Sequence, residues 1–311
     1  MDRIAETSVV DAVGPVEAVP TAAGFGGQSM SATLRRVMVR RPAEPTGPGD
    51  WKAFGYRHPI DGGTTATEHA AFVATLRGEG VEVIEEAGDP AGELDAIFAY
   101  DPSLMTDAGA VLLRMGKPER GDEVAMHHRT YDRIGIPIAG RIEAPGTVEG
   151  GDTLWLDDRT LAVGRGYRTN GAGIAQLGRI LGEQRIEVIA VDLPHWHGPA
   201  ECLHLMSLIS PVAADLAVVY PSLLPVSFVE QLAERGWRTV EVPEAEFESL
   251  GCNVLALAPG VCLMIEGNPG TRAGLEAAGC RVLTYAGDEI SHNREGGPTC
   301  LTRPLLRSEG A

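Results

Sequence analysis

A degenerate repeat runs through this chain of 311 residues and restricts the folds that it can adopt. In each copy, a helix-like segment ends in Leu, three residues and Gly, and an extended apolar stretch follows. The regular copies are LRGEGVEVI (76–84), LAERGWRTVEV (232–242) and LEAAGCRVLTY (275–285). Two degenerate copies, YDRIGIPI (131–138) and LGEQRIEVI (181–189), lie between them and keep either the Gly or the Leu.

The residue at the Gly position marks the point where a helix gives way to a strand. Glycine tolerates the left-handed conformation that ends many helices, and Val- and Ile-rich runs are typical of strands. The marker residues are Gly80, Gly135, Arg185, Gly236 and Gly279, a period of roughly 43–55 residues. We therefore predict five α/β units arranged radially, with a functional site on the central axis. Helix, Gly and strand also follow one another in other α/β proteins, and that alternative stays open.

The charge of the chain limits its partners. The formal net charge is −17, and no run of Lys or Arg interrupts the acidic background. Nucleic acid and anionic membrane surfaces are therefore excluded as expected partners, whereas a cationic small molecule would be attracted. No stretch approaches the ~18 consecutive apolar residues of a membrane-spanning helix.

The cysteines indicate a reduced, cytoplasmic protein. There are five of them, an odd number, and no CxxC pair occurs. This pattern favours neither a disulfide framework nor a structural zinc site. Cys300 follows two glycines in GGPTC and stands at a predicted loop-to-strand junction. The other four are expected to be structural: Cys202, Cys252, Cys262 and Cys280.

The N-terminal segment differs in composition from the rest of the chain. Residues 1–32 contain small residues with scattered Gly and Pro, no sustained periodicity, and none of the features of a secretory signal. We expect a disordered leader over 1–32 and a single folded domain over 33–311. The first strand is predicted to begin at Leu34 in LRRVMVRRP.

Polar motifs fall within the first predicted units. Asp95 and Asp101 flank the apolar run AIFAY, and Arg120 precedes a glycine in PERGDE. A carboxylate at the end of a buried strand needs a partner, so each aspartate is either a turn residue or a receptor for a cation. An arginine in this position belongs to a solvated charge cluster or clamps a carboxylate with its planar fork.

Further candidates lie in the middle units. Glu149 precedes two glycines, which would let another group approach the backbone closely, and Arg168 in GYRTN is a second candidate clamp. His195 and His197 have a spacing compatible with metal binding, but no pattern of carboxylates or cysteines completes such a site. His204 lies in the apolar stretch CLHLMSLI and is a core residue unless a cysteine faces it.

Taken in order, these motifs resemble those of the pentein superfamily of guanidino-group-modifying enzymes, which includes arginine deiminases, amidinotransferases and dimethylarginine dimethylaminohydrolases. The resemblance extends from about residue 34 to residue 302 and implies a five-bladed α/β propeller of five ββαβ-type repeats around a central active site. The matching elements are LRRVMVRRP, FAYDPSL, RGDE, EGGDTLWL, GYRTNGAG, CLHLMSLI, CNVLAL and GGPTC.

The resemblance implies a role for each matching residue. Cys300 looks like the nucleophile that attacks the guanidinium carbon, and His204 looks like the general acid and base. Asp101 and Glu149 resemble the carboxylates that hold the guanidinium group. Carboxylates around Cys300 should raise the pKa of its thiol, and a bound cation should lower it, so substrate binding is expected to help form the thiolate.

The same resemblance covers the amino-acid end of the substrate. Arg120 and Arg168 resemble the arginines that bind the α-carboxylate, and Asp95 is a weaker match to a further polar contact. The implied reaction leaves an amidino group on the cysteine, which water then releases as a urea product such as citrulline. It needs no metal and no organic cofactor.

One position departs from part of the superfamily. Arginine deiminases and amidinotransferases typically carry an aspartate two residues after the catalytic histidine, where this chain has Met206. An apolar neighbour fits a methylated nitrogen better, so dimethylarginine is the favoured substrate. Arginine, another guanidino compound and amidino transfer remain alternatives, as does a binding scaffold without catalysis. A homodimer is left open, and the loop 51–63 is either a lid or a surface loop.

Overall fold

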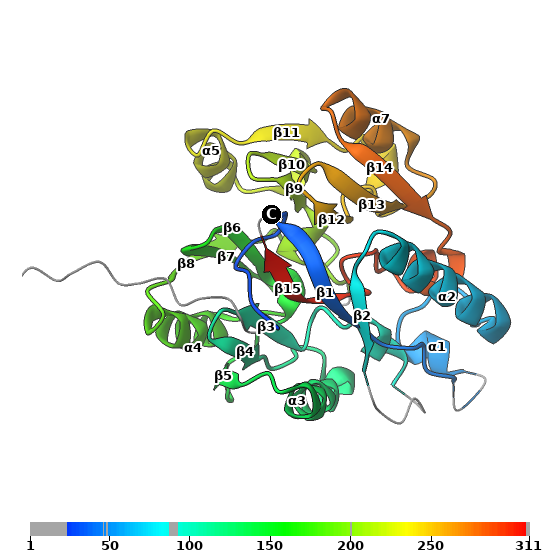
Figure 1. The fold of residues 1–311 in the computed structure, drawn as a ribbon, viewed down its shortest axis with the longest axis horizontal. Coiled ribbons are helices and arrows are strands. Elements are labelled where there is room, and N and C mark those ends of the chain that lie inside the picture. The colour runs from blue at the N-terminus through cyan, green and yellow to red at the C-terminus, as the bar shows by residue number, and fades with distance from the viewer. Residues whose placement is uncertain (1–23, 46, 48, 87–92, 200, 309–311) are drawn as a thin grey trace, which may run out of the picture.

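The computed structural model describes residues 24–45, 47, 49–86, 93–199 and 201–308, and these form five three-stranded sheets. The sheets lie around a common centre, with the longer helices toward the outside (Figure 1). In each sheet, two strands pair antiparallel and the third joins parallel to one of them. The fold is therefore α/β with ββαβ units, as the repeat predicts.

The strands of four sheets follow the chain order. These are β3 (Ser103–Thr106), β4 (Gly109–Leu112) and β5 (Ile138–Arg141); β6 (Thr153–Asp157), β7 (Thr160–Arg165) and β8 (Glu187–Asp192); β9 (Ile209–Ala213), β10 (Leu216–Val219) and β11 (Arg238–Glu241); and β12 (Val254–Ala258), β13 (Val261–Ile265) and β14 (Arg281–Tyr285). The fifth sheet joins the two ends of the domain and contains β15 (Arg303–Ser308), β1 (Thr33–Val39) and β2 (Glu82–Glu85).

One helix leads to the third strand of every sheet. The five are α2 (Gly62–Gly78), α3 (Glu123–Ile134), α4 (Gly171–Gly182), α5 (Val226–Glu234) and α7 (Pro269–Ala277). Shorter helical turns lie in the connections: α1 (Asp50–Ala53), α6 (Glu244–Phe247), η1 (Leu94–Ile97), η2 (Pro118–Arg120), η3 (Gly150–Asp152), η4 (Leu205–Ser207), η5 (Pro221–Leu223) and η6 (Asp288–His292). Among the described residues, no helix combines the length and the apolarity that a bilayer crossing requires.

The five marker residues all adopt the left-handed conformation. Their φ angles lie between 60° and 92°, and the residue after each one donates a backbone hydrogen bond to the marker Leu or Tyr carbonyl. This is the helix-ending geometry that glycine favours because it has no Cβ. Arg185 adopts it at φ 60° without being glycine, so the degenerate copy preserves the structure without the residue. All five units of the repeat are confirmed.

The expected leader lies partly outside the described residues, which begin at Gly24. Residues 24–32 are packed on the fold: Gly26 accepts a hydrogen bond from the Arg307 amide and donates one to the Leu305 carbonyl. Gln28 and Ser31 are buried. This segment therefore extends the sheet that joins the two ends of the domain.

Candidate active site

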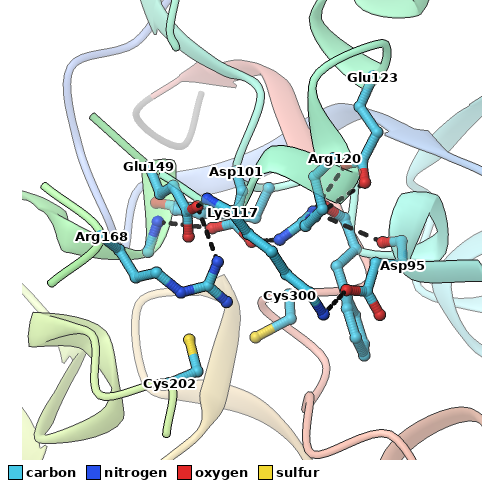
Figure 2. A network of polar contacts seen from close by, with 12 residues as sticks. Asp95, Asp101, Lys117, Arg120, Glu123, Glu149, Arg168, Cys202 and Cys300 are labelled. Carbon is cyan, nitrogen blue, oxygen red and sulfur yellow. Dashed lines mark hydrogen bonds and ion pairs between the residues drawn. The ribbon is translucent and has the colours of Figure 1, made fainter. Parts of the chain in front are cut away.

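A cavity of about 860 Å³ opens beside the starts of the innermost strands. Each of these strands is preceded, within five residues, by a polar residue of the site. Four of these residues line the cavity: Asp101 before β3, His204 before β9, Asn253 before β12 and Cys300 before β15. Glu149, before β6, contacts His204. Figure 2 shows Asp101, Glu149 and Cys300 of this set, which come together from separate segments. The candidate active site therefore draws one residue from each of the five units.

Cys300 carries a thiol that faces the cavity and has one side-chain hydrogen-bond partner among the described residues. The Asn253 amide Nδ2 donates to Sγ at 3.2 Å, and its Oδ1 accepts from the Thr299 amide at 3.1 Å. Gly297 is required here because a Cβ would meet Asn253 at 2.5 Å. Burial, with the nearby Asp101 carboxylate, raises the pKa of Cys300 to about 11. The resting thiol is therefore protonated at neutral pH.

His204 forms an ion pair with Glu149 in the wall of the site. Its Nε2 lies 2.9 Å from Oε2 of Glu149, and both residues are buried. Burial alone would lower the pKa of His204, but Cys202, Asp152 and Asp101 outweigh it and raise the pKa well above its usual value. The imidazole is therefore positively charged in the resting site.

The two glycines after Glu149 make room for this arrangement. A Cβ on Gly150 would lie 2.1 Å from the Tyr100 carbonyl, and one on Gly151 would lie 2.3 Å from Nδ1 of His204. The expectation that EGG lets another group approach the backbone is confirmed, and the approaching group is the histidine itself. Asp152, which the sequence reading missed, accepts a hydrogen bond from the Leu205 amide at 3.0 Å and so fixes the backbone beside His204.

Glu149 has little access to a substrate. Its side chain is fully buried and does not line the cavity. Oε1 accepts hydrogen bonds from the amides of Gly116 and Lys117 and from Arg168, and Oε2 faces His204. Burial would raise the pKa of this carboxyl, but His204 and Arg168 lower it to about 2. The geometry makes Glu149 the ion-pair partner that orients His204, and does not support direct contact with a guanidinium group.

Asp101 is the predicted guanidinium carboxylate that does line the cavity. Oδ1 accepts from the Gly151 amide at 2.8 Å, and Oδ2 accepts from Nη1 of Arg120 at 2.6 Å. Burial opposes ionisation, but Arg120 and His204 hold the pKa of Asp101 below its usual value. Asp101 is therefore a charged, fixed acceptor beside Cys300.

The structure corrects the prediction for Arg120. Its guanidinium group is 3% exposed and donates to both oxygens of Glu123, to Asp101 and to the carbonyls of Asp95 and Phe98. A side chain with its donors already satisfied has little left for a substrate carboxylate. Arg120 instead positions Asp101 (Figure 2).

Removing the Arg120 charge is expected to destabilise the fold. In Arg120→Met, Asp101 and Glu123 would be left as buried carboxylates without their cation, which costs about 3–5 kcal/mol of unfolding free energy. Urea denaturation followed by circular dichroism measures this loss. Arg238→Met, at the exposed ion pair with Asp215, is the matched control and should change stability little. Equal effects of the two variants would contradict the assigned role.

Asp95 lines the cavity but is held by neighbours. Nζ of Lys117 lies 2.6 Å from Oδ2, and the Tyr56 hydroxyl donates to Oδ1 at 2.9 Å. Lys117 also lines the cavity and donates to the Phe54 carbonyl. The predicted polar contact is therefore a pair, Lys117 with Asp95, rather than a lone aspartate.

The described residues that line the cavity include four arginines: Arg57, Arg120, Arg168 and Arg294. Arg168 is partly buried, with one nitrogen on Glu149 at 3.0 Å, which leaves it compatible with its predicted role as a carboxylate clamp. Arg294 was missed by the sequence reading. It is 4% exposed and lines the cavity, and its Nη2 has no hydrogen-bond partner in the described part of the chain. NREGGPTC contains this residue six positions before Cys300, so its proximity to the predicted nucleophile is a signal that could have revealed it.

Cys202 is not the structural cysteine that the sequence reading expected. It is exposed, lines the cavity, and places Sγ 3.6 Å from each ring nitrogen of His204. With Glu149 and His204 it forms a group whose ligand atoms lie within 4.8 Å of one another, close enough for a soft divalent metal. Because two of these residues belong to the predicted catalytic set, a metal there would compete with that set.

Met206 does not lie beside the substrate site, where a contact with a methylated nitrogen was predicted. Its side chain is 5% exposed and does not line the active-site cavity, but faces a separate small cavity with Tyr100. It therefore does not contact a methylated nitrogen in this structure. The loop 51–63 reaches the active-site cavity through Phe54, Gly55 and Arg57, so it forms part of the rim.

Comparisons with known proteins agree with this architecture. The family model for arginine deiminase matches residues 95–236 and 224–307. A relative from Listeria welshimeri, named arginine deiminase, is 28% identical over 252 residues, covering 68% of this chain and 61% of the relative. Another arginine deiminase, from Rhodococcus erythropolis, is 28% identical over 311 residues, covering 90% of this chain and 73% of the relative. The chain thus spans about three fifths of the length of the Listeria protein.

A solved structure gives a similar picture of the fold. The adduct of a dimethylarginine dimethylaminohydrolase with 4-chloro-2-hydroxymethylpyridine superposes with a TM-score of 0.70 at 25% sequence identity. The match covers 89% of this chain and 100% of that one. The five three-stranded sheets are therefore the shared feature of this chain and that structure.

Proposed function

The chain belongs to the arginine deiminase family within the pentein superfamily, and on that premise we propose that it hydrolyses the guanidinium group of an arginine derivative. One observation carries the proposal: the Cys300 thiol, the charged His204 and the Asp101 carboxylate lie on one cavity, and a buried carboxylate holds the histidine. A nucleophile, a proton donor and a receptor for a cation are the groups that this reaction requires.

The resting charges explain why the substrate itself would activate the nucleophile. Cys300 is protonated because burial and Asp101 raise its pKa to about 11. A guanidinium cation bound against Asp101 would offset that negative charge and lower the pKa of the thiol. The thiol proton would then leave for solvent or for the substrate, and the thiolate would stand beside the electrophilic carbon.

The covalent steps balance with these residues alone. The thiolate sulfur bonds to the guanidinium carbon, and His204 protonates the departing nitrogen as the carbon–nitrogen bond breaks. An amidino group remains on Cys300. The neutral His204 then takes a proton from water, the hydroxide adds to the carbon, and the carbon–sulfur bond breaks to release a urea derivative and regenerate the thiolate.

We further propose that a methylated arginine is the preferred substrate. Arginine offers five guanidinium N–H donors, and asymmetric dimethylation removes two of them. Glu149 is turned to His204, and position 206 carries no aspartate, so Asp101 is the one of the two predicted guanidinium carboxylates that lines the cavity. Phe98, Leu203 and Leu250 also line the cavity and would pack against methyl groups. Of the carboxylates that line the cavity, Asp101 is the one whose charge raises the pKa of Cys300, and a single acceptor there suits the substrate with fewer N–H donors.

The amino-acid end of the substrate would meet the arginines of the cavity. Arg168 and Arg294 both line it, and a guanidinium group binds a carboxylate through its planar fork of N–H donors. The acidic surface of the chain would favour the approach of a cationic substrate.

Product analysis tests both levels of the proposal. The purified protein would be incubated separately with arginine and with asymmetric dimethylarginine, and citrulline, ammonia and dimethylamine would be quantified. Citrulline with dimethylamine, at a higher kcat/KM than citrulline with ammonia, is the expected result. Faster release of ammonia from arginine would overturn the methylarginine preference and retain the hydrolase. Transfer of the amidino group to an added amine, without citrulline, would establish amidino transfer instead.

The raised thiol pKa gives a separate prediction about labelling. Modification of Cys300 by neutral iodoacetamide should become about tenfold faster per pH unit from pH 7 to pH 10, because the thiolate fraction keeps rising below a pKa of about 11. Peptide mapping separates Cys300 from the other thiols. A cationic haloacetamidine should react faster than iodoacetamide at pH 7, since it supplies the charge that the site lacks. A rate that levels off below pH 8 would contradict the raised pKa.

A further inference from the structure

A second, smaller cavity lies among the innermost strands themselves. Its lining includes residues of all five: Met105 of β3, Trp155 of β6, Pro211 of β9, Leu255 of β12 and Arg303 of β15. This axial cavity is therefore enclosed by the ring of sheets, whereas the active site lies beside the strand starts. β15 passes through the middle of that ring in Figure 1.

Two buried cations border the axial cavity. Arg303 is 3% exposed and Arg307 is 5% exposed, and both line it. Within the described part of the chain, neither side chain forms an ion pair with a carboxylate, in contrast to the buried Arg120. Buried charges in proteins are normally paired, because transfer of an isolated ion from water costs several kcal/mol.

The hydrogen bonds of these arginines leave donors unused. Nη2 of Arg303 donates to the Tyr100 carbonyl at 2.6 Å, and its Nε has no partner among the described residues. Nη1 of Arg307 donates to the Ala32 carbonyl at 2.6 Å. Burial lowers the pKa of Arg307 to about 10, and the neighbouring Arg303 adds to this effect. Carbonyl oxygens satisfy some donors, and Cζ of Arg303 lies 3.8 Å from the centre of the Tyr100 ring, but none of these partners carries a full negative charge.

Neutral polar groups complete the lining. The Tyr100 hydroxyl donates to the sulfur of Met30 at 3.8 Å, and sulfur is a weak acceptor. The hydroxyl of Ser29 accepts from the amides of Ser31 and Ala32 and keeps its own proton to donate. With the two guanidinium groups, these hydroxyl groups give the axial cavity a lining that contains hydrogen-bond donors and positive charge.

The size of the axial cavity selects the ligand. Its volume is about 20 Å³. A single water-sized particle needs about 10–15 Å³ on this measure, so a phosphate or a carboxylic acid is too large. A water molecule would fit, but it would leave both charges uncompensated.

We propose that the axial cavity binds one small monovalent inorganic anion of the size of chloride, held between Arg303 and Arg307. The site is distinct from the active site and does not depend on the proposed reaction. It is also connected to that site, because Arg303 bonds the carbonyl of Tyr100, and the next residue is Asp101. Loss of the anion is therefore expected to loosen the segment that carries the guanidinium receptor.

Thermal unfolding in matched salts tests the proposal. The protein would be dialysed into sodium gluconate, whose anion is too large, and titrated with sodium chloride or bromide at constant ionic strength. We expect Tm to rise by about 2–5 °C and to saturate, as binding of one ligand to the folded state requires. Arg303→Gln should remove this rise. Arg238→Gln, on the surface, is the control and should retain it.

Diffraction provides a second readout that does not need the variant to fold. Crystals of the wild-type protein grown in bromide should show an anomalous peak between Arg303 and Arg307. A Tm that is the same in gluconate and chloride would overturn the proposal. So would a cavity that holds only water when bromide is present at a saturating concentration.

Discussion

Cys300→Ser is expected to lower kcat by at least about 10⁴-fold, with little effect on substrate binding. The serine hydroxyl ionises far less readily than the thiol, and nothing in the site is arranged to deprotonate it. Asn253 is the side chain that donates to Sγ, and Asp101, the carboxylate that raises the pKa of the thiol, is occupied by Arg120 and Gly151. Release of citrulline and amine, measured at saturating substrate, reports kcat, and isothermal titration calorimetry reports binding.

Cys202→Ser is the matched control for this prediction. The same chemical change is made in the same cavity, on the thiol that lies 3.6 Å from the ring of His204. Cys202 raises the pKa of His204 but forms no bond in the covalent steps, so kcat should fall by less than about tenfold. If Cys202→Ser abolished activity and Cys300→Ser did not, the nucleophile would have been assigned to the wrong cysteine.

The fold could be predicted from the sequence because its unit is local. A helix end, a left-handed residue and a Val-rich strand leave a recognisable pattern within about ten residues, and five copies fix the architecture. Even the degenerate copy at Arg185 keeps the conformation, because the hydrogen bond from Ile186 to the Leu181 carbonyl holds it. The same repetition explains why the polar motifs of the candidate site lie at the starts of the innermost strands.

The partners of the charged residues could not be predicted in this way. Arg120 and Arg168 both stand beside glycines in the sequence and both line the cavity, yet the donors of Arg120 are taken up by Glu123 and Asp101 whereas Arg168 has one nitrogen on Glu149. The direction of a side chain depends on what packs around it, and those neighbours come from distant segments. Met206 illustrates the same limit: it lies two residues from His204 but faces the axial cavity.

The other large effect is expected at Glu149, which touches no substrate in the proposed mechanism. Glu149→Gln should lower kcat by about 10³- to 10⁴-fold and change KM much less, as removal of the charge behind a catalytic histidine does elsewhere. The carboxylate is charged at every assay pH because its pKa is about 2. Glutamine keeps the shape, but it offers the imidazolium a neutral oxygen or an N–H group in place of the anion at 2.9 Å.

The pH profile separates a positioning role from a structural one. Loss of the Glu149 charge should lower the pKa of His204, so the limb of the kcat profile that reports its deprotonation should move toward lower pH. Glu119→Gln makes the same change on the exposed rim of the cavity and should leave that limb in place. A Glu149→Gln variant with reduced Tm, reduced kcat and an unshifted limb would show that the carboxylate only supports the fold. A pH profile shifted to lower pH at unchanged Tm would establish that Glu149 sets the pKa of His204, because a change in packing alone does not remove a charge that stabilises the imidazolium.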